Sequence, residues 1–165
     1  MTKKPKPNFL EILRILRKYQ VEFIVVGGVC AVLHGAPIST FDLDLVHSRA
    51  PNNIDRLMVA LKTLDAHYRG RGTRKMRPGV SHLSSPGHQL LMTKAGPLDL
   101  LGVIGKTSGY NELLEHTIQL EVGRGLPIRL LDLETLIKVK EETARDRDKA
   151  ILPILRRTLE EKSKT

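Results

Sequence analysis

Hydrophobic residues along the 165-residue chain recur at helical spacing in some segments and in short continuous runs in others. Apolar residues three and four positions apart predict one amphipathic helix that begins at Asn8, with Glu11 as capping partner, and another over 51–64. Short β-branched or aliphatic runs predict strands over 21–26, 41–46, 89–93 and 97–104, the last two joined by a turn at 94–96. This succession predicts helices packed against a β-sheet.

The rest of the chain continues the same mixture of elements. We expect a loop over 68–79, a short helix over 110–116, strands over 118–122 and 128–130, and two C-terminal helices, the first capped by Asp132. The prediction is an α/β fold with a mixed β-sheet, helices packed against it and a helical C-terminus. We expect one domain over 8–165 after a flexible basic tail at 1–7.

Cysteine use and hydropathy narrow the class of protein. Cys30 is the only cysteine, which excludes an internal disulfide or a thiolate zinc cluster, and its apolar neighbours favour a buried core thiol. The apolar runs are too short to cross a bilayer, and no signal-peptide block follows the basic N-terminus. We therefore expect a cytoplasmic protein with no membrane partner.

The positive charge is unevenly distributed. The net charge is +9, and the segment from Ala66 to Leu98 contains no acidic residue. Such a segment favours polyanions, which predicts RNA binding through Arg69, Arg71, Arg74, Lys75 and Arg77. A solvated basic loop that only aids solubility explains the charge equally well, because three Phe and three Tyr give few platforms for stacked bases.

Two aspartates lie two positions apart on the predicted strand over 41–46. Alternation along a strand places Asp42 and Asp44 on one face, where their carboxylates repel each other. A divalent cation, Mg²⁺ or Mn²⁺, removes that repulsion, and Mg²⁺ prefers carboxylate oxygens together with substrate phosphates. The alternative is a pair of solvated aspartates on an edge strand.

Gly27 and Gly28 lie where the first predicted strand turns into a helix. Without side chains there, a phosphate can approach the backbone and the free N–H groups of the helix start. The spacing matches neither a dinucleotide-binding G-x-G-x-x-G motif nor a P-loop. His34, near the end of that helix, is expected to hydrogen-bond locally rather than to bind a metal.

The segment from Gly27 to Leu45, with Gly-Gly, His-Gly and Thr-x-Asp-x-Asp-Leu after a strand, resembles the DNA polymerase β-like nucleotidyltransferase superfamily. Within it, the chain is similar over residues 20–155 to small bacterial proteins grouped with abortive-infection nucleotidyltransferase toxins. The resemblance implies the nucleotidyltransferase fold and a catalytic, metal-binding set of Asp42, Asp44 and Asp99. It also implies nucleotide contacts from Gly27, Gly28, Thr40, Lys140 and Asp148. Lys140 and the run Arg145-Asp146-Arg147-Asp148 resemble a C-terminal family element that is implied to help hold the nucleotide triphosphate.

The function implied is Mg²⁺-dependent transfer of a nucleoside monophosphate from an NTP to a hydroxyl acceptor. The basic segment favours RNA over protein as the acceptor, in a toxin–antitoxin or phage-defence setting with a cognate partner. Two alternatives stay open: an antitoxin-type enzyme that modifies a partner toxin, and a catalytically degenerate nucleotide-binding module. The second alternative draws on two departures from the family, Gly28 where relatives often have Ser, and Ile38-Ser39 where they often have Arg.

Overall fold

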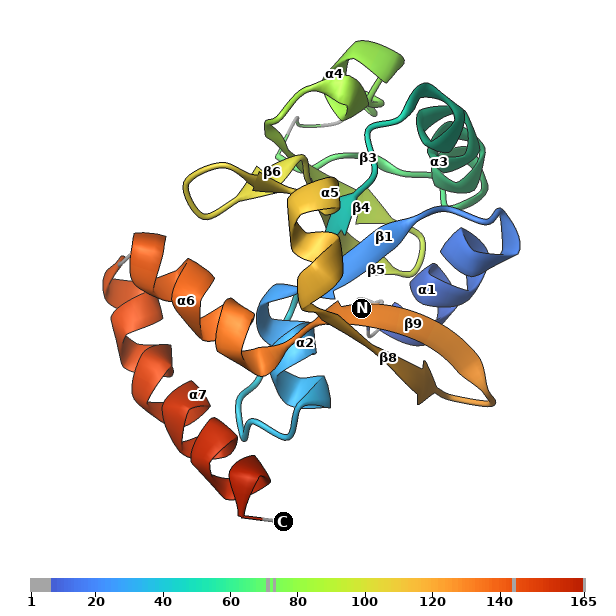
Figure 1. The fold of residues 1–165 in the computed structure, drawn as a ribbon. Coiled ribbons are helices and arrows are strands. Elements are labelled where there is room, and N and C mark those ends of the chain that lie inside the picture. Colours follow the sequence, from blue (N-terminus) through green and yellow to red (C-terminus); the bar gives the residue numbers. More distant parts are fainter. Residues whose placement is uncertain (1–6, 71, 73, 144, 165) are drawn as a thin grey trace, which may run out of the picture.

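The computed structural model describes residues 7–70, 72, 74–143 and 145–164. Among these residues, seven strands form one sheet in the order β3-β4-β5-β2-β1-β9-β8, and β6 pairs with β7 in a separate hairpin (Figure 1). The strands are β1 (Phe23–Val26), β2 (Leu43–His47), β3 (His67–Tyr68), β4 (His88–Thr93), β5 (Gly96–Leu101), β6 (Val103–Ile104), β7 (Ser108–Gly109), β8 (Thr117–Val122) and β9 (Leu126–Leu131). The β2–β5 and β1–β9 pairs are parallel and the other pairs are antiparallel, so the predicted mixed sheet is confirmed.

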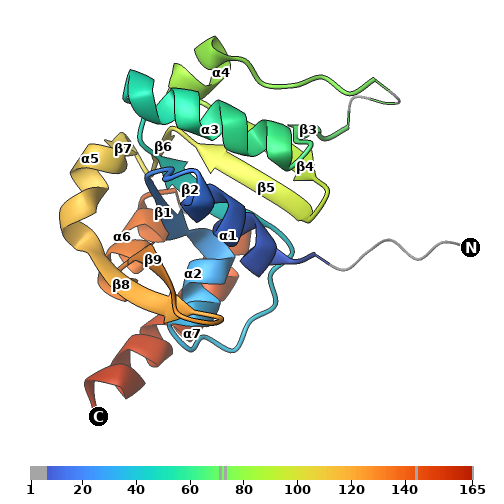
Figure 2. The same ribbon diagram turned by 90° about the vertical axis from the view of Figure 1, so that its right-hand side faces the viewer.

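Helices flank the sheet on both sides. They are α1 (Phe9–Lys18), α2 (Gly27–Leu33), α3 (Pro51–Thr63), α4 (Val80–Ser84), α5 (Tyr110–Leu113), α6 (Leu133–Thr143) and α7 (Asp146–Ser163), with a 3₁₀ turn η1 at Leu114–His116. Helices α1 and α3 pack together on one side, and the C-terminal pair α6 and α7 lies on the other (Figure 1 and Figure 2). The predicted helical C-terminus is therefore confirmed.

The centre of the sheet separates an apolar face from a face that carries acids. Leu43 and Leu45 on β2 are aligned with Leu98 and Leu100 on β5, and all four side chains are fully buried in the hydrophobic core. Because side chains alternate along a strand, the residues between these leucines point to the opposite face. The same register therefore sets the intervening aspartates of β2 and β5 side by side.

Two predicted helix caps are present. The Asn8 side chain accepts a hydrogen bond from the Glu11 backbone N–H at 3.1 Å, and Asp132 Oδ1 accepts one from Thr135 N–H at 2.7 Å. The Asn8 N–H donates to Ala95 O at 2.8 Å, which ties the start of α1 to the β4–β5 turn. The predicted basic tail at 1–7 lies outside the described residues except for Pro7.

Several predicted boundaries were wrong. Strand β2 begins at Leu43 rather than at residue 41, which leaves Asp42 in a bend before the strand. The predicted strand over 97–104 breaks at Gly102, where the backbone of Ser85 and Pro86 comes too close for a side chain. The predicted loop over 68–79 begins inside β3, and the following α4 was missed, because elements of two to five residues are too short to show a periodicity.

Cys30 is fully buried in the core, and its thiol donates to Leu131 O at 3.2 Å. Burial raises the pKa of Cys30 to about 12, so the thiolate does not form near neutral pH. The interpretation of Cys30 as a core thiol is confirmed. No helix in the described part of the chain is long and apolar enough to cross a membrane.

His34 links the centre of the fold to the C-terminal helix. Its Nδ1 lies 2.8 Å from Lys162 Nζ on α7, and its Nε2 lies 2.8 Å from Leu131 O at the end of β9. Since an ammonium group can only donate, Nδ1 accepts and the protonated Nε2 donates. The expectation of a local hydrogen bond was wrong, because both partners are distant in sequence. Burial, and then the Lys162 charge, lowers the pKa of His34.

We expect this contact to make stability depend on pH. The pKa of His34 is lowered in the folded state, so the unfolded chain takes up a proton at this residue before the folded protein does. The contribution of neutral His34 to the free energy of unfolding is therefore complete above pH 6.5, the pKa of the residue in the unfolded chain, and is lost as the pH falls below it. The melting temperature of the wild type relative to that of His34→Gln should therefore decrease by a few degrees between about pH 7.5 and pH 5.5. His47, whose pKa is also lowered by burial, is unchanged in both proteins. Equal pH dependence in the two proteins would contradict the assignment.

Candidate functional site

Asp44 and Asp99 are neighbours on the acid-bearing face of the sheet. They are register partners in the parallel β2–β5 pair, and Asp99 is buried while Asp44 is mostly buried. Burial, followed by the charge and hydrogen bond of Asp99 and the charge of Asp42, raises the pKa of Asp44 to about 7, while the charge of Lys140 opposes the shift. Two adjacent carboxylates therefore lie where full ionisation of both is unfavourable without a further cation.

Asp99 has a cationic neighbour but retains free acceptor capacity. Its Oδ1 lies 2.8 Å from Arg69 Nη1, within ion-pair distance, while the same Nη1 donates a hydrogen bond to Leu91 O at 2.8 Å. Oδ1 is buried and accepts no hydrogen bond of good geometry from any residue that the structure describes. A buried carboxylate oxygen without a donor is costly unless another ligand reaches it.

Asp42 lies just outside this pair. It is partly exposed in the bend before β2, and its carbonyl accepts a hydrogen bond from Thr40 Oγ1 at 3.2 Å. Within the described ranges, no three His, Cys, Asp or Glu side chains are gathered closely enough to form a complete metal cage. The Asp44–Asp99 pair nevertheless fits a hard divalent cation in donor chemistry, because Mg²⁺ commonly takes one or two protein carboxylates and completes its shell with water and phosphate.

The two glycines at the start of α2 allow close approach of two of the predicted site residues. Gly27 has a φ of +68°, and a Cβ atom there would overlap the Asp44 carboxylate. A Cβ atom at Gly28 would lie 2.5 Å from Thr40 Oγ1. The predicted glycine turn is confirmed, and the structure adds a packing reason for it: the missing side chains make room for Asp44 and Thr40.

A cavity of about 320 Å³ opens between Asp44, the β6 strand and the helices α6 and α7. Four of the predicted site residues line it, namely Gly27, Asp44, Lys140 and Asp148. Its other polar lining residues are His88, Thr143, Arg145 and Arg147. Among the described residues, the remaining predicted site residues do not line the cavity, namely Gly28, Thr40, Asp42 and Asp99.

The side of the cavity away from the sheet is cationic. Lys140 Nζ lies 3.5 Å from Asp148 Oδ1, and Asp148 Oδ2 accepts from Thr143 Oγ1 at 3.3 Å, so Asp148 orients the lysine. Arg145 and Arg147 add two further positive charges to the wall. Both arginines belong to the Arg145-Asp146-Arg147-Asp148 run at the start of α7, which the family resemblance implies to help hold the triphosphate, although only Asp148 of this run was a predicted site residue.

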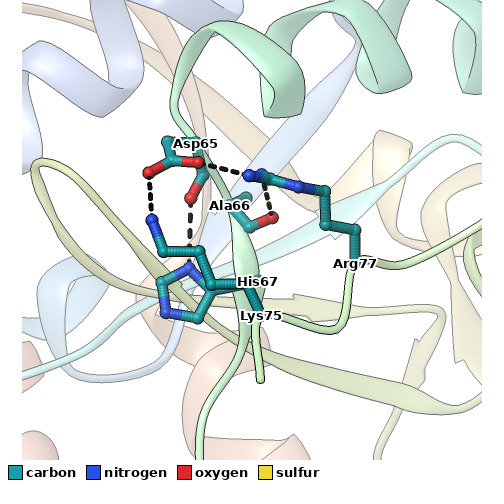
Figure 3. Close-up of polar contacts among 5 residues, drawn as sticks. All are labelled: Asp65, Ala66, His67, Lys75 and Arg77. Atoms are coloured by element: carbon teal, nitrogen blue, oxygen red, sulfur yellow. Dashed lines mark hydrogen bonds and ion pairs between the residues drawn. The ribbon is translucent and has the colours of Figure 1, made fainter. Parts of the chain in front are cut away.

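The basic segment over 69–77 is partly neutralised by acids of the same chain. Asp65 accepts from Lys75 Nζ at 2.8 Å and from Arg77 Nη2 at 2.6 Å, and these hydrogen bonds lower the pKa of Asp65 to about 2 (Figure 3). Arg69 pairs with Asp99, Arg74 is exposed, and Arg71 lies outside the described residues. Three of the five predicted RNA-binding cations therefore have internal partners, and RNA binding stays a prediction.

Comparisons with known proteins bear on the fold. No protein-family model matches the chain, and no curated protein matches its sequence. A Thermotoga maritima protein assigned as a nucleotidyltransferase aligns with 93% of this chain and 91% of its own at 18% identity, with a TM-score of 0.58. The lincosamide antibiotic adenylyltransferase LnuA, solved with lincomycin, aligns with 92% of this chain and 98% of its own at 10% identity and a TM-score of 0.62.

A third structure extends the same likeness. ANT(2'')-Ia, in complex with adenylyl-2''-tobramycin, aligns with 92% of this chain and 87% of its own at 13% identity and a TM-score of 0.56. Since all three identities are low and the alignments cover most of each chain, the likeness concerns the arrangement of the backbone. The chain has the fold of these nucleotidyltransferases.

Proposed function

We propose that this chain transfers a nucleoside monophosphate from a metal-bound NTP to a hydroxyl acceptor. The observation that carries the proposal is the charge arrangement of the cavity, with Asp44 at the sheet and Lys140, Arg145 and Arg147 on the opposite wall. A nucleoside triphosphate with its divalent cation has the complementary pattern, since the cation meets the carboxylates and the phosphates meet the cationic side chains. The shared fold with adenylyltransferases supports the same reaction class.

Asp44 and Asp99 are the residues that would hold Mg²⁺ or Mn²⁺, and Asp42, in the bend before β2, would add a third carboxylate charge near them. Asp42 is close enough to contribute to the raised pKa of Asp44. A bound divalent cation supplies charge neutralisation at the triphosphate and at the attacking oxygen. We infer that loading the site also relieves the repulsion between the two buried carboxylates.

Side chains around the cavity would bind the triphosphate, neutralise the leaving pyrophosphate and accept the proton of the acceptor hydroxyl. Lys140 binds the triphosphate, positioned by Asp148, while Arg145 and Arg147 neutralise the pyrophosphate that leaves. Gly27 and Gly28, with Thr40, keep the strand-to-helix turn close to Asp44 so that the nucleotide can reach the carboxylates. The acceptor oxygen bonds to the α-phosphorus, the bond from that phosphorus to the pyrophosphate breaks, and Asp99 accepts the hydroxyl proton.

The acceptor is proposed to approach over the face of β4 and β5 that carries Leu90 and Asp99. Leu90 is opposite Asp99 in the register and is 47% exposed, and Phe41, beside Asp42, is 77% exposed. The RNA hypothesis draws on Arg71 and Arg74 of the basic segment, and modification of a partner toxin is the alternative from the resemblance. LnuA and ANT(2'')-Ia, whose structures contain an antibiotic or its adenylyl product, suggest small hydroxylated molecules as a further acceptor class.

If RNA is the acceptor, we expect Arg71→Glu combined with Arg74→Glu to reduce RNA labelling by about tenfold or more, because phosphate contacts dominate RNA affinity. The pair avoids Arg69 and Arg77, because replacing Arg69 would remove the ion pair with Asp99 and replacing Arg77 would remove one of the two ion pairs of Asp65. The measurement is transfer from labelled NTP to RNA, to small hydroxylated molecules and to proteins of a cell lysate, at low and moderate salt. Equal RNA labelling by both proteins would contradict a role for the basic segment, and a single labelled protein would favour a toxin partner.

A further inference from the structure

Arg69 reaches from the edge of the sheet to the carboxylate pair at its centre. Its backbone N–H donates to Leu90 O at 3.1 Å, which continues the β3–β4 pairing by one residue. Its side chain then crosses β4, where Nη1 donates to Leu91 O and lies 2.8 Å from Asp99 Oδ1. Leu90 is the register partner of Asp99, so the backbone and the side chain of Arg69 converge on the same point of the sheet.

Side chains of the segment after Arg69 contact Asp65 and Ala66, the two residues before β3. Asp65 forms ion pairs with Lys75 and Arg77 (Figure 3). The Tyr68 N–H donates to Met76 O at 2.8 Å. Arg77 Nη1 also donates to Ala66 O at 3.1 Å. Asp65 and Arg77 thus bring the two ends of the segment together beside β3, the strand from which Arg69 extends.

Arg69 supplies the positive charge nearest to Asp99 among the ion pairs that the described residues form. The carboxylate needs such a charge, because it is buried and lies beside Asp44. A divalent cation shared by Asp44 and Asp99 would bring a second positive charge to the same carboxylate. Two cations at contact distance from one carboxylate repel each other strongly in a partly buried site.

We propose that Arg69 is a resident counter-ion of Asp99, which orients this carboxylate and weakens the binding of a divalent cation to the Asp44–Asp99 pair. It is a positioning residue that sets metal affinity through Asp99, and it does not itself contact the transferred phosphate. The inference rests on the proposed function in one respect, since it takes this carboxylate pair as the metal site. The consequence is that the metal must be recruited together with the triphosphate, whose negative charge offsets the Arg69 charge.

The test is a titration of the metal-free protein with Mn²⁺ alone, in which electron paramagnetic resonance measures the free ion, at low ionic strength and about pH 8.5. Arg69→Gln and Arg69→Met should each bind Mn²⁺ about tenfold more tightly than the wild type, because the competing charge is removed. Arg69→Lys, which retains the charge, should stay within about threefold of the wild type. Arg74→Gln is the matched control, since Arg74 is exposed in the same basic segment, and it should change the affinity by less than about twofold.

The outcomes separate this inference from the proposed function. Unchanged or weaker Mn²⁺ binding by Arg69→Gln or Arg69→Met, in proteins with wild-type-like circular dichroism, would overturn the counter-ion role. An equal gain in Arg74→Gln would also overturn it, because the effect would then come from general surface charge. Mn²⁺ binding that survives in Asp44→Asn, or that is absent from every variant, would overturn the metal site of the proposed function and the inference with it.

Discussion

Asp44→Asn is expected to abolish nucleotidyl transfer and, in metal-free buffer, to make the protein more stable. Activity should fall by roughly 10²–10³-fold or more, because the carboxylate that neutralises charge at the reacting phosphate is lost. The stability should increase because Asn removes a buried charge that is repelled by Asp99 and Asp42. Few substitutions that only damage a fold raise its melting temperature, so the two opposite changes together identify a functional carboxylate.

The stability gain has a defined pH dependence. The pKa of Asp44 is raised from 3.8 to about 7 in the folded protein, so the folded state binds this proton more tightly than the unfolded state does. Wild-type stability should therefore fall as the pH rises from about 4 to about 7, and the advantage of Asp44→Asn should be largest above that window. Thermal unfolding with a chelator at several pH values measures it. A variant that is less stable than the wild type at about pH 8 would contradict the repulsion between the carboxylates.

Lys140→Met is expected to weaken metal-dependent NTP binding by about ten- to a hundredfold, the loss expected for one charge-assisted phosphate contact. Lys140 lines the cavity and is close enough to Asp44 to lower its pKa, so it lies between the carboxylates and the cationic wall. Calorimetric titration with Mg²⁺ and NTP gives the affinity.

Lys138→Met provides the matched control for this prediction. Lys138 belongs to the same helix α6 but is exposed, so its replacement changes the net charge equally without altering the cavity. We expect it to retain wild-type affinity within about twofold, because exposed charges are screened by solvent and salt. Equal losses in the two variants would show that α6 acts only through its overall charge, and the assignment of Lys140 would then be wrong.

The sequence was most informative where local pattern and tertiary structure agree. Alternation of Leu43, Asp44 and Leu45 correctly separated a core face from an acidic face, since period-two spacing survives in any sheet. It could not show that Asp99 is aligned with Asp44, because the register of two strands far apart in sequence depends on packing between them. Asp99 was found only through its resemblance to the third carboxylate of a family.

The contacts that shape the site were hidden for the same reason. Arg69 was interpreted as one of a row of exposed basic residues, and only the pairing of β3, β4 and β5 brings it to Asp99. Arg145 and Arg147 join the cavity because α6 and α7 fold back beside Asp44, an arrangement that their own sequence does not specify. The sequence therefore identifies the charged residues of the site, while the tertiary structure determines which of them lie close enough to interact.

The most direct test of the central claim is a comparison of NTP labelled at the α-phosphate with the same NTP labelled at the γ-phosphate. The purified protein is incubated with Mg²⁺, each labelled NTP and a set of acceptors that contains RNA, small hydroxylated molecules and lysate protein, with Asp44→Asn as the control. The account predicts that α-label becomes attached to an acceptor, that γ-label appears in released pyrophosphate, and that the variant forms neither product. Transfer of γ-label, or no transfer of α-label to any acceptor by a folded wild-type protein, would contradict nucleotidyl transfer.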